Sequence, residues 1–72
     1  MNSVCDDLRN RFTYHPPTAD QVPRYEAVRA AALLLALQLE QLVPDSPERD
    51  RAFDALDEVV WRANAAIARR EG

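Results

Sequence analysis

Most of the side chains that could bind a ligand gather in one short stretch near the N-terminus. The stretch combines two guanidinium groups, three rings and two polar side chains: Arg9, Asn10, Arg11, Phe12, Thr13, Tyr14 and His15. Guanidinium groups hold phosphate through paired hydrogen bonds, and aromatic rings stack on nucleobases. A nucleotide ligand is therefore one interpretation. The other, which chemistry alone favours, is an arm that packs its rings on the rest of the chain and leaves its arginines in solvent.

Two further places in the sequence could contact an anion. Arg29 lies beside the apolar run 30–32, so its charge needs a partner. That partner could be Glu26, Asp20, an acid of a neighbouring subunit, or a bound phosphate. A second polar and cationic patch near the C-terminus comprises Asn64, Arg69 and Arg70. Complementing the negative end of a helix dipole is the simpler explanation for that patch.

The sequence lacks the patterns of a catalytic or metal site. Cys5 and His15 are the single cysteine and histidine, and no third group that could orient them as nucleophile and base is recognisable. Four acids share one face of the helix expected over residues 47–70: Asp50, Asp54, Asp57 and Glu58. They could bind a hard cation, but a solvated face with a Glu58–Arg62 ion pair is the favoured interpretation. We expect no enzyme, no cofactor and no metal.

The size and charge of the chain restrict what it can be. Its 72 residues allow one small domain, which rarely gains more than ~5 kcal/mol from its own core. A single cysteine excludes an intrachain disulfide, so helix packing and self-association remain as sources of stability. The net charge of −3 argues against DNA or RNA polymers as ligands. All nine basic residues are arginine, which is consistent with bidentate phosphate contacts, although genome composition could produce the same set equally well.

No segment predicts a membrane span or a secretory signal. The most apolar run, residues 30–37, is far shorter than the ~20 residues that cross a bilayer. Residues 1–7 are acidic and lack the basic start and long apolar run of a signal peptide. We expect a cytoplasmic protein, which a lone cysteine also suits.

Apolar spacing and turn signals predict an all-α fold. An N-terminal arm covers residues 1–17, and a long antiparallel helical hairpin covers residues 18–72, within a single domain. The hairpin consists of long helices over 18–43 and 47–70. Thr18, in a capping box, or Asp20 can cap the first helix, while Ser46 caps the second.

Two apolar stripes should face each other in this hairpin. The first comprises Tyr25, Val28, Ala32, Leu35, Leu39 and Leu42, and the second comprises Phe53, Leu56, Val60, Ala63 and Ile67. Other apolar side chains, including Leu33, Leu34 and Leu37, lie off the stripes. An isolated hairpin would leave these leucines in water, so we expect a homo-oligomer.

Four segments carry a resemblance to a known family. They are Asn-Arg-Phe-Thr-Tyr-His-Pro-Pro-Thr at 10–18, Arg-Tyr-Glu-Ala-Val-Arg at 24–29, Pro-Asp-Ser at 44–46 and Ala-Asn-Ala-Ala-Ile-Ala-Arg at 63–69. In combination they resemble the small phage anti-CBASS sponge proteins, which sequester the cyclic oligonucleotide signals of a bacterial immune pathway. The hairpin domain is shared with the anti-Thoeris sponges. The resemblance covers about residues 9 to 70.

The resemblance implies a fold, an assembly and a ligand class. The fold is a short N-terminal helix followed by a helical hairpin, assembled as a compact homohexamer. Pockets between protomers bind cyclic dinucleotides such as cyclic GMP-AMP without degrading them, and some members hold cyclic trinucleotides at separate interface sites. The same resemblance places the chain in the cytoplasm of an infected bacterial host.

The resemblance also implies individual site residues. Tyr14 would stack on a base and Arg29 would contact phosphate. The cyclic dinucleotide site as a whole comprises Tyr14, Arg29, Arg11 and His15, and the cyclic trinucleotide site comprises Arg69, Arg70 and Ala31. Two positions depart from the family pattern. Trp61 stands one step before the usual aromatic position, which Arg62 occupies, and Ala31 replaces a hydroxyl side chain.

These observations together predict a non-catalytic sponge. A symmetric interface presents each residue twice, so two copies of Tyr14 and Arg29 could meet the two bases and two phosphates of a cyclic dinucleotide. Sequestration needs no catalytic group. The alternative is a structural or protein-binding helical hairpin that has no nucleotide ligand and uses its leucine surface on another protein.

Overall fold

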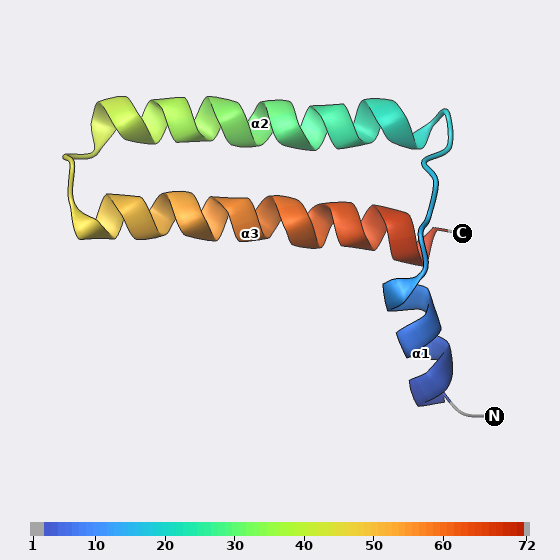
Figure 1. Cartoon of the computed structure of the whole chain (residues 1–72). Coiled ribbons are helices and arrows are strands. Elements are labelled where there is room, and N and C mark those ends of the chain that lie inside the picture. The colour runs from blue at the N-terminus through green and yellow to red at the C-terminus, as the bar shows by residue number, and fades with distance from the viewer. Residues whose placement is uncertain (1–2, 72) are drawn as a thin grey trace.

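The computed structural model describes residues 3–71 and contains three helices. They are α1 (Ser3–Phe12), α2 (Gln21–Leu42) and α3 (Pro47–Arg70), with no strand among the described residues. Helices α2 and α3 run antiparallel as a hairpin, and α1 projects at an angle from the end of the hairpin where α3 finishes (Figure 1). The predicted all-α class is confirmed. Within the described part, no helix is both long and apolar enough to cross a membrane.

The start of α2 agrees with the second of the two capping alternatives in position only, because the Asp20 side chain makes no capping hydrogen bond. Asp20 occupies the N-cap position, so Pro23 falls in the first turn, where a missing N–H costs little. The capping box is only half formed. The Oε1 atom of Gln21 accepts from the N–H of Thr18 at 3.0 Å, but the Thr18 hydroxyl donates to Asp20 Oδ1 at 2.7 Å instead of capping the helix.

The turn between the long helices is fixed by Ser46 and Arg49. Ser46 caps α3 by accepting from the N–H of Arg49 at 3.1 Å, and Pro47 is the first helical residue, as predicted. The guanidinium of Arg49 reaches back across the turn. It donates to the carbonyl oxygens of Glu40 and Val43, each at 3.2 Å, and pairs with Asp45 at 3.3 Å. One cation therefore satisfies carbonyls at the end of α2 that have no helical partner.

The open end of the hairpin is closed by a polar clamp, which comprises Gln21, Arg24 and Glu71. Gln21 is the only buried polar side chain in the described part, and its Nε2 donates to the Ile67 carbonyl and to Glu71 Oε1, each at 3.2 Å. Arg24 binds both carboxylate oxygens of Glu71, with its Nη1 2.6 Å from Oε2. The start of α2 is thereby joined to the end of α3.

The predicted apolar stripes are correct for most of their length and wrong at one end. Leu42 is 80% exposed and Leu35 is 45% exposed, while Ala36 and Val43 are half-buried in their place. A straight helix turns once per 3.6 residues, so a stripe drawn at steps of three and four drifts by about 20° per seven residues. Over the length of α2 this drift moves the inward position by one residue.

The hairpin covers only part of its own apolar surface. No hydrophobic side chain in the described part is buried, and Leu33, Leu34 and Leu37 are all more than half exposed. The chain measures 51 × 28 × 14 Å, with a radius of gyration of 15.8 Å. A compact domain of this length would have a radius of gyration of about 11 Å. The single chain is a flat, open scaffold with apolar surface on both faces.

Removing the Gln21 side chain should weaken the hairpin. Gln21→Ala deletes three hydrogen bonds and leaves the Thr18 N–H and the Ile67 carbonyl without their partner, so we expect a loss of about 1–3 kcal/mol. Urea unfolding at a fixed chain concentration measures this loss in the free energy of unfolding. Gln41→Ala, on an exposed part of α2, is the matched control and should change the midpoint little. Equal shifts for the two variants would contradict the clamp.

The Arg24–Glu71 contact predicts a defined acid response. Hydrogen bonds from Arg24 and then Gln21 lower the pKa of Glu71 from its ordinary value of 4.5 to about 2. Stability from this carboxylate is therefore present above pH 4.5 and is lost as the pH falls toward 2. Glu71→Gln cannot carry the charge. The melting temperature of the native chain should exceed that of Glu71→Gln at pH 7, and the difference should close between pH 4.5 and 2. A difference that stays constant over this range would argue against the charged contact.

Candidate ligand-binding site

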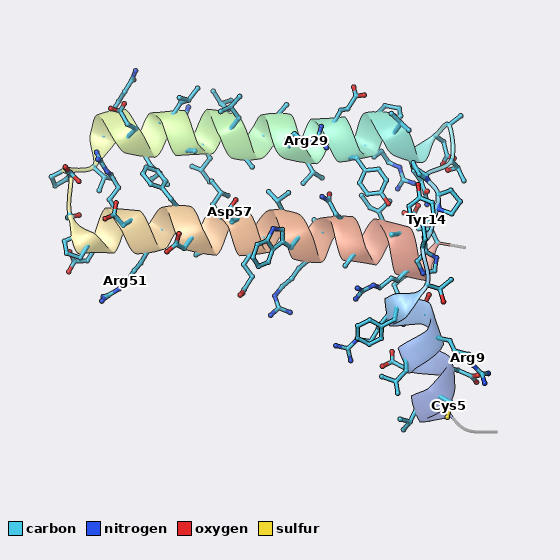
Figure 2. All side chains as sticks on the ribbon, in the orientation of Figure 1. Cys5, Arg9, Tyr14, Arg29, Arg51 and Asp57 are labelled. Carbon is cyan, nitrogen blue, oxygen red and sulfur yellow. The ribbon has the colours of Figure 1, made fainter. Side chains whose placement is uncertain are left out.

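The connector between α1 and α2 presents Tyr14 to solvent. Residues 13–20 are not helical, and the consecutive prolines Pro16 and Pro17 favour extended backbone there. The Tyr14 side chain is 80% exposed and lies beside the open end of the hairpin (Figure 2). Next to it, His15 donates from Nε2 to the carbonyl oxygen of Asn10 at 2.6 Å. His15 thus fixes the connector against the end of α1 and leaves the neighbouring ring free to stack.

Asn10 and Arg69 attach α1 to the hairpin. Asn10 Nδ2 donates to the carbonyl oxygen of Arg69 at 3.1 Å, and Arg69 Nη2 donates to the carbonyl oxygen of Arg11 at 3.4 Å. These two bonds join residues nearly sixty positions apart in the sequence. Asn10 belongs to the motif at 10–18, but its role in holding α1 could not be read from the sequence, because its partner is a distant backbone carbonyl.

The arginines expected in a trinucleotide site border one shallow hollow. Arg69 and Arg70 line it together with Trp61, Arg62 and two alanines, around a volume of about 430 Å³. Arg62 pairs with Glu58 at 3.3 Å, as the sequence predicted, whereas Arg70 makes no ion pair with any described residue. Trp61 faces this hollow even though it stands one position from the usual place of the aromatic.

Ala31, the third expected trinucleotide residue, lies elsewhere on the hairpin. It lines an apolar hollow of about 340 Å³ between α2 and α3, beside Ala63. Arg69 lies six residues further along α3, a rise of about 9 Å. One chain therefore places Ala31 in a different hollow from Arg69 and Arg70.

Arg29 borders a third hollow, on the face of the hairpin between α2 and α3. The hollow has a volume of about 320 Å³, and its floor is apolar, with Phe53, Leu56 and Val60 from α3. Among the acids that could have paired with Arg29, Asp20 instead pairs with Arg24 at 3.5 Å. Arg29 is exposed and makes no ion pair with any described residue, so its guanidinium is free to contact an acid of a neighbouring subunit or a bound phosphate.

Tyr14 and Arg29 are separated within one chain. Arg29 lies about 12 Å along α2 from its first residue, and the connector that carries Tyr14 lies beyond that end (Figure 2). Arg11 is engaged locally, 3.7 Å from Asp7 and 5.8 Å from the centre of the Phe12 ring. The structure therefore groups Arg11, Tyr14 and His15 at the end of the hairpin and sets Arg29 apart on its face.

The residues considered for catalysis or metal binding do not come together in the described structure. Cys5 lies near the start of α1, about 10 Å along the helix from the end that leads to His15. Among the described residues, no group of three or more His, Cys, Asp or Glu side chains is arranged to hold a metal ion. The described residues therefore offer a ligand the exposed ring of Tyr14, several unpaired guanidinium groups and hollows lined by apolar side chains.

Comparison with known proteins identifies the family of the chain. The family model described as the Acb2/Tad1 hairpin domain matches residues 6–68, nearly the whole chain. The chain belongs to this family. No curated protein and no solved structure matches it. The matched range includes α2, the turn and most of α3, and it also includes the connector that carries Tyr14.

The contact between Asn10 and Arg69 predicts that α1 depends on one side chain. In Asn10→Ala this bond is lost, so amide hydrogen exchange over residues 3–12 should become faster, with a loss of about 0.5–1.5 kcal/mol in overall stability. Arg9→Ala, an exposed position on the same helix, should leave both quantities close to the native values. Unchanged exchange in Asn10→Ala would show that α1 is held in another way.

Proposed function

We propose that the chain is a non-catalytic sponge that binds cyclic dinucleotides at interfaces between its copies and withholds them from CBASS signalling. The match to the Acb2/Tad1 hairpin domain over residues 6–68 is the observation that carries this proposal. The ligands are cyclic oligonucleotides such as cyclic GMP-AMP. Cyclic trinucleotides form a second ligand class, which would bind at a separate site that comprises Arg69, Arg70 and Ala31. The site of action is the cytoplasm of an infected bacterial host.

The geometry of the single chain supports a site that needs more than one copy. The hollow beside Arg29 has about 320 Å³, at the lower end of the roughly 300–1,000 Å³ typical of small-molecule pockets, and it is open to solvent. Tyr14 lies too far along the chain to close it. A two-fold axis would bring the Tyr14 ring of one copy toward the Arg29 side of another, and it would repeat both residues once for each half of the ligand.

The exposed apolar surface supports self-association. A chain with no buried hydrophobic side chain gains little from its own core, and covering Leu33, Leu34 and Leu37 with a second copy removes them from water. We propose a homohexamer, as the family resemblance implies. The same leucines favour the rival function, a hairpin that binds another protein, so ligand binding must decide between the two.

The chemistry needed for a sponge is binding alone. Two guanidinium groups would neutralise the two phosphates through charge-assisted hydrogen bonds, and two phenol rings would stack on the two bases. No bond of the ligand forms or breaks, so its removal from signalling depends on affinity and on the concentration of sites. The released ligand should be chemically unchanged.

Calorimetric titration with cyclic GMP-AMP, cyclic di-GMP, cyclic di-AMP and a cyclic trinucleotide tests the function. Bound ligand is then recovered by heat denaturation and analysed by chromatography. Uptake followed by recovery of intact ligand supports the sponge. Cleaved ligand would indicate an enzyme, and no uptake of any ligand would leave the protein-binding hairpin.

Substitutions at Tyr14 and Arg29 test the proposed site. Tyr14→Ala removes a stacking surface worth about 1–3 kcal/mol per base, and Arg29→Ala removes a charge-assisted contact worth about 1.5–3 kcal/mol. Each variant should bind cyclic dinucleotides at least about tenfold more weakly while the oligomer persists on sizing. Tyr14→Phe keeps the ring, and Arg51→Ala removes an exposed arginine far from Arg29 (Figure 2); both should bind normally. Normal binding by Tyr14→Ala and Arg29→Ala would show that these two residues do not form the cyclic dinucleotide site.

A further inference from the structure

Asp57 is an acid that borders the same hollow as Arg29 and has no ion-pair partner among the described residues. It lies on α3, and Arg29 lies on α2, so a cation and an anion border one apolar floor from opposite helices (Figure 2). The two do not pair with each other, and neither pairs with any other described residue. An ion pair between them would have neutralised both charges. Instead, the hollow keeps one donor group on α2 and one acceptor group on α3, both exposed to a ligand.

A ligand that fits this hollow needs complementary groups at its two ends. It must carry a negative charge for Arg29, an apolar or aromatic middle for the floor, and hydrogen-bond donors for the carboxylate of Asp57. A second phosphate near Asp57 would be repelled, which fixes the direction in which the ligand lies. A nucleotide with its phosphate at Arg29 and its base edge at Asp57 meets all three requirements.

The bases differ in what they offer a carboxylate. Guanine carries adjacent N1–H and N2–H donors, which can bond the two oxygens of one carboxylate at the same time. Adenine offers one donor at N6 beside a ring nitrogen that is an acceptor, so one carboxylate oxygen would face a lone pair. A site whose acceptor is left unpaired rejects the wrong ligand strongly.

We infer that Asp57 is a specificity-determining residue that selects guanine-containing cyclic dinucleotides by accepting from the guanine N1–H and N2–H groups. The inference rests on the proposed function, since it names the base preference of the same site. Each hollow takes one nucleotide half, with the phosphate on Arg29 and the guanine edge on Asp57. Tyr14 of another copy stacks on that base. Cyclic di-GMP, with two guanines, is the ligand that uses both hollows of a symmetric pair.

The experiment compares cyclic di-GMP with cyclic di-AMP by calorimetric titration of the full chain and of Asp57→Asn. These ligands share their ring and phosphates and differ in the base. The native chain should bind cyclic di-GMP at least about tenfold more tightly, and Asp57→Asn should lose most of that preference, chiefly by weaker binding of cyclic di-GMP. Asp54→Asn makes the same chemical change at an exposed position outside the hollow and should keep the preference.

The possible results separate this inference from the proposed function. If the native chain binds both ligands equally, or if Asp57→Asn keeps the native preference, Asp57 does not read the base, although the chain still binds cyclic dinucleotides. If the native chain binds neither ligand nor any other cyclic dinucleotide, the proposed function fails and the role of Asp57 fails with it. Asp57 makes no ion pair or hydrogen bond in the described structure, so its substitution should not unfold the chain.

Discussion

The constraint on which this structure depends is that two helices cannot surround their own apolar side chains. Within the described chain no hydrophobic residue is fully buried, and polar contacts at the two ends of the hairpin add to the half-buried apolar stripes in fixing the relative position of the helices. Arg49 holds the turn, and Gln21 with Arg24 and Glu71 holds the open end. These contacts define the geometry, but they leave large apolar faces whose burial between copies would supply most of the stability.

The same constraint decides where a ligand can be held. The described residues bury no hydrophobic side chain, the hollows that they form are open to solvent, and the candidate binding groups lie on different parts of the surface. Tyr14 is presented by a connector that is braced through His15 and Asn10, while Arg29 remains unpaired on the face of the hairpin. In the proposed assembly, contact between copies would bury the leucines and close the hollows together, which would couple assembly to ligand binding.

Local signals predicted much of this fold from the sequence. The cap at Ser46, the Glu58–Arg62 pair and the exposed leucines off the stripes depend on neighbours within a few residues, and all are found. The inward positions near Leu42 were wrong because the helix drifts from a seven-residue repeat. The clamp at Gln21 and the attachment of α1 by Asn10 could not be predicted, since they depend on carbonyls 46 and 59 positions away. The candidate site itself came from the resemblance in the motifs, because composition and spacing alone left a packed arm as the simpler explanation.

The central claim is that the ligand site forms between copies of the chain. Native mass spectrometry tests it directly, because it gives the number of chains and the number of bound ligands in one spectrum. With cyclic dinucleotide present, the account predicts an assembly of several 8.2 kDa chains, six in the proposed hexamer, with one dinucleotide for every two chains. A single 8.2 kDa chain that retains one dinucleotide would contradict the claim.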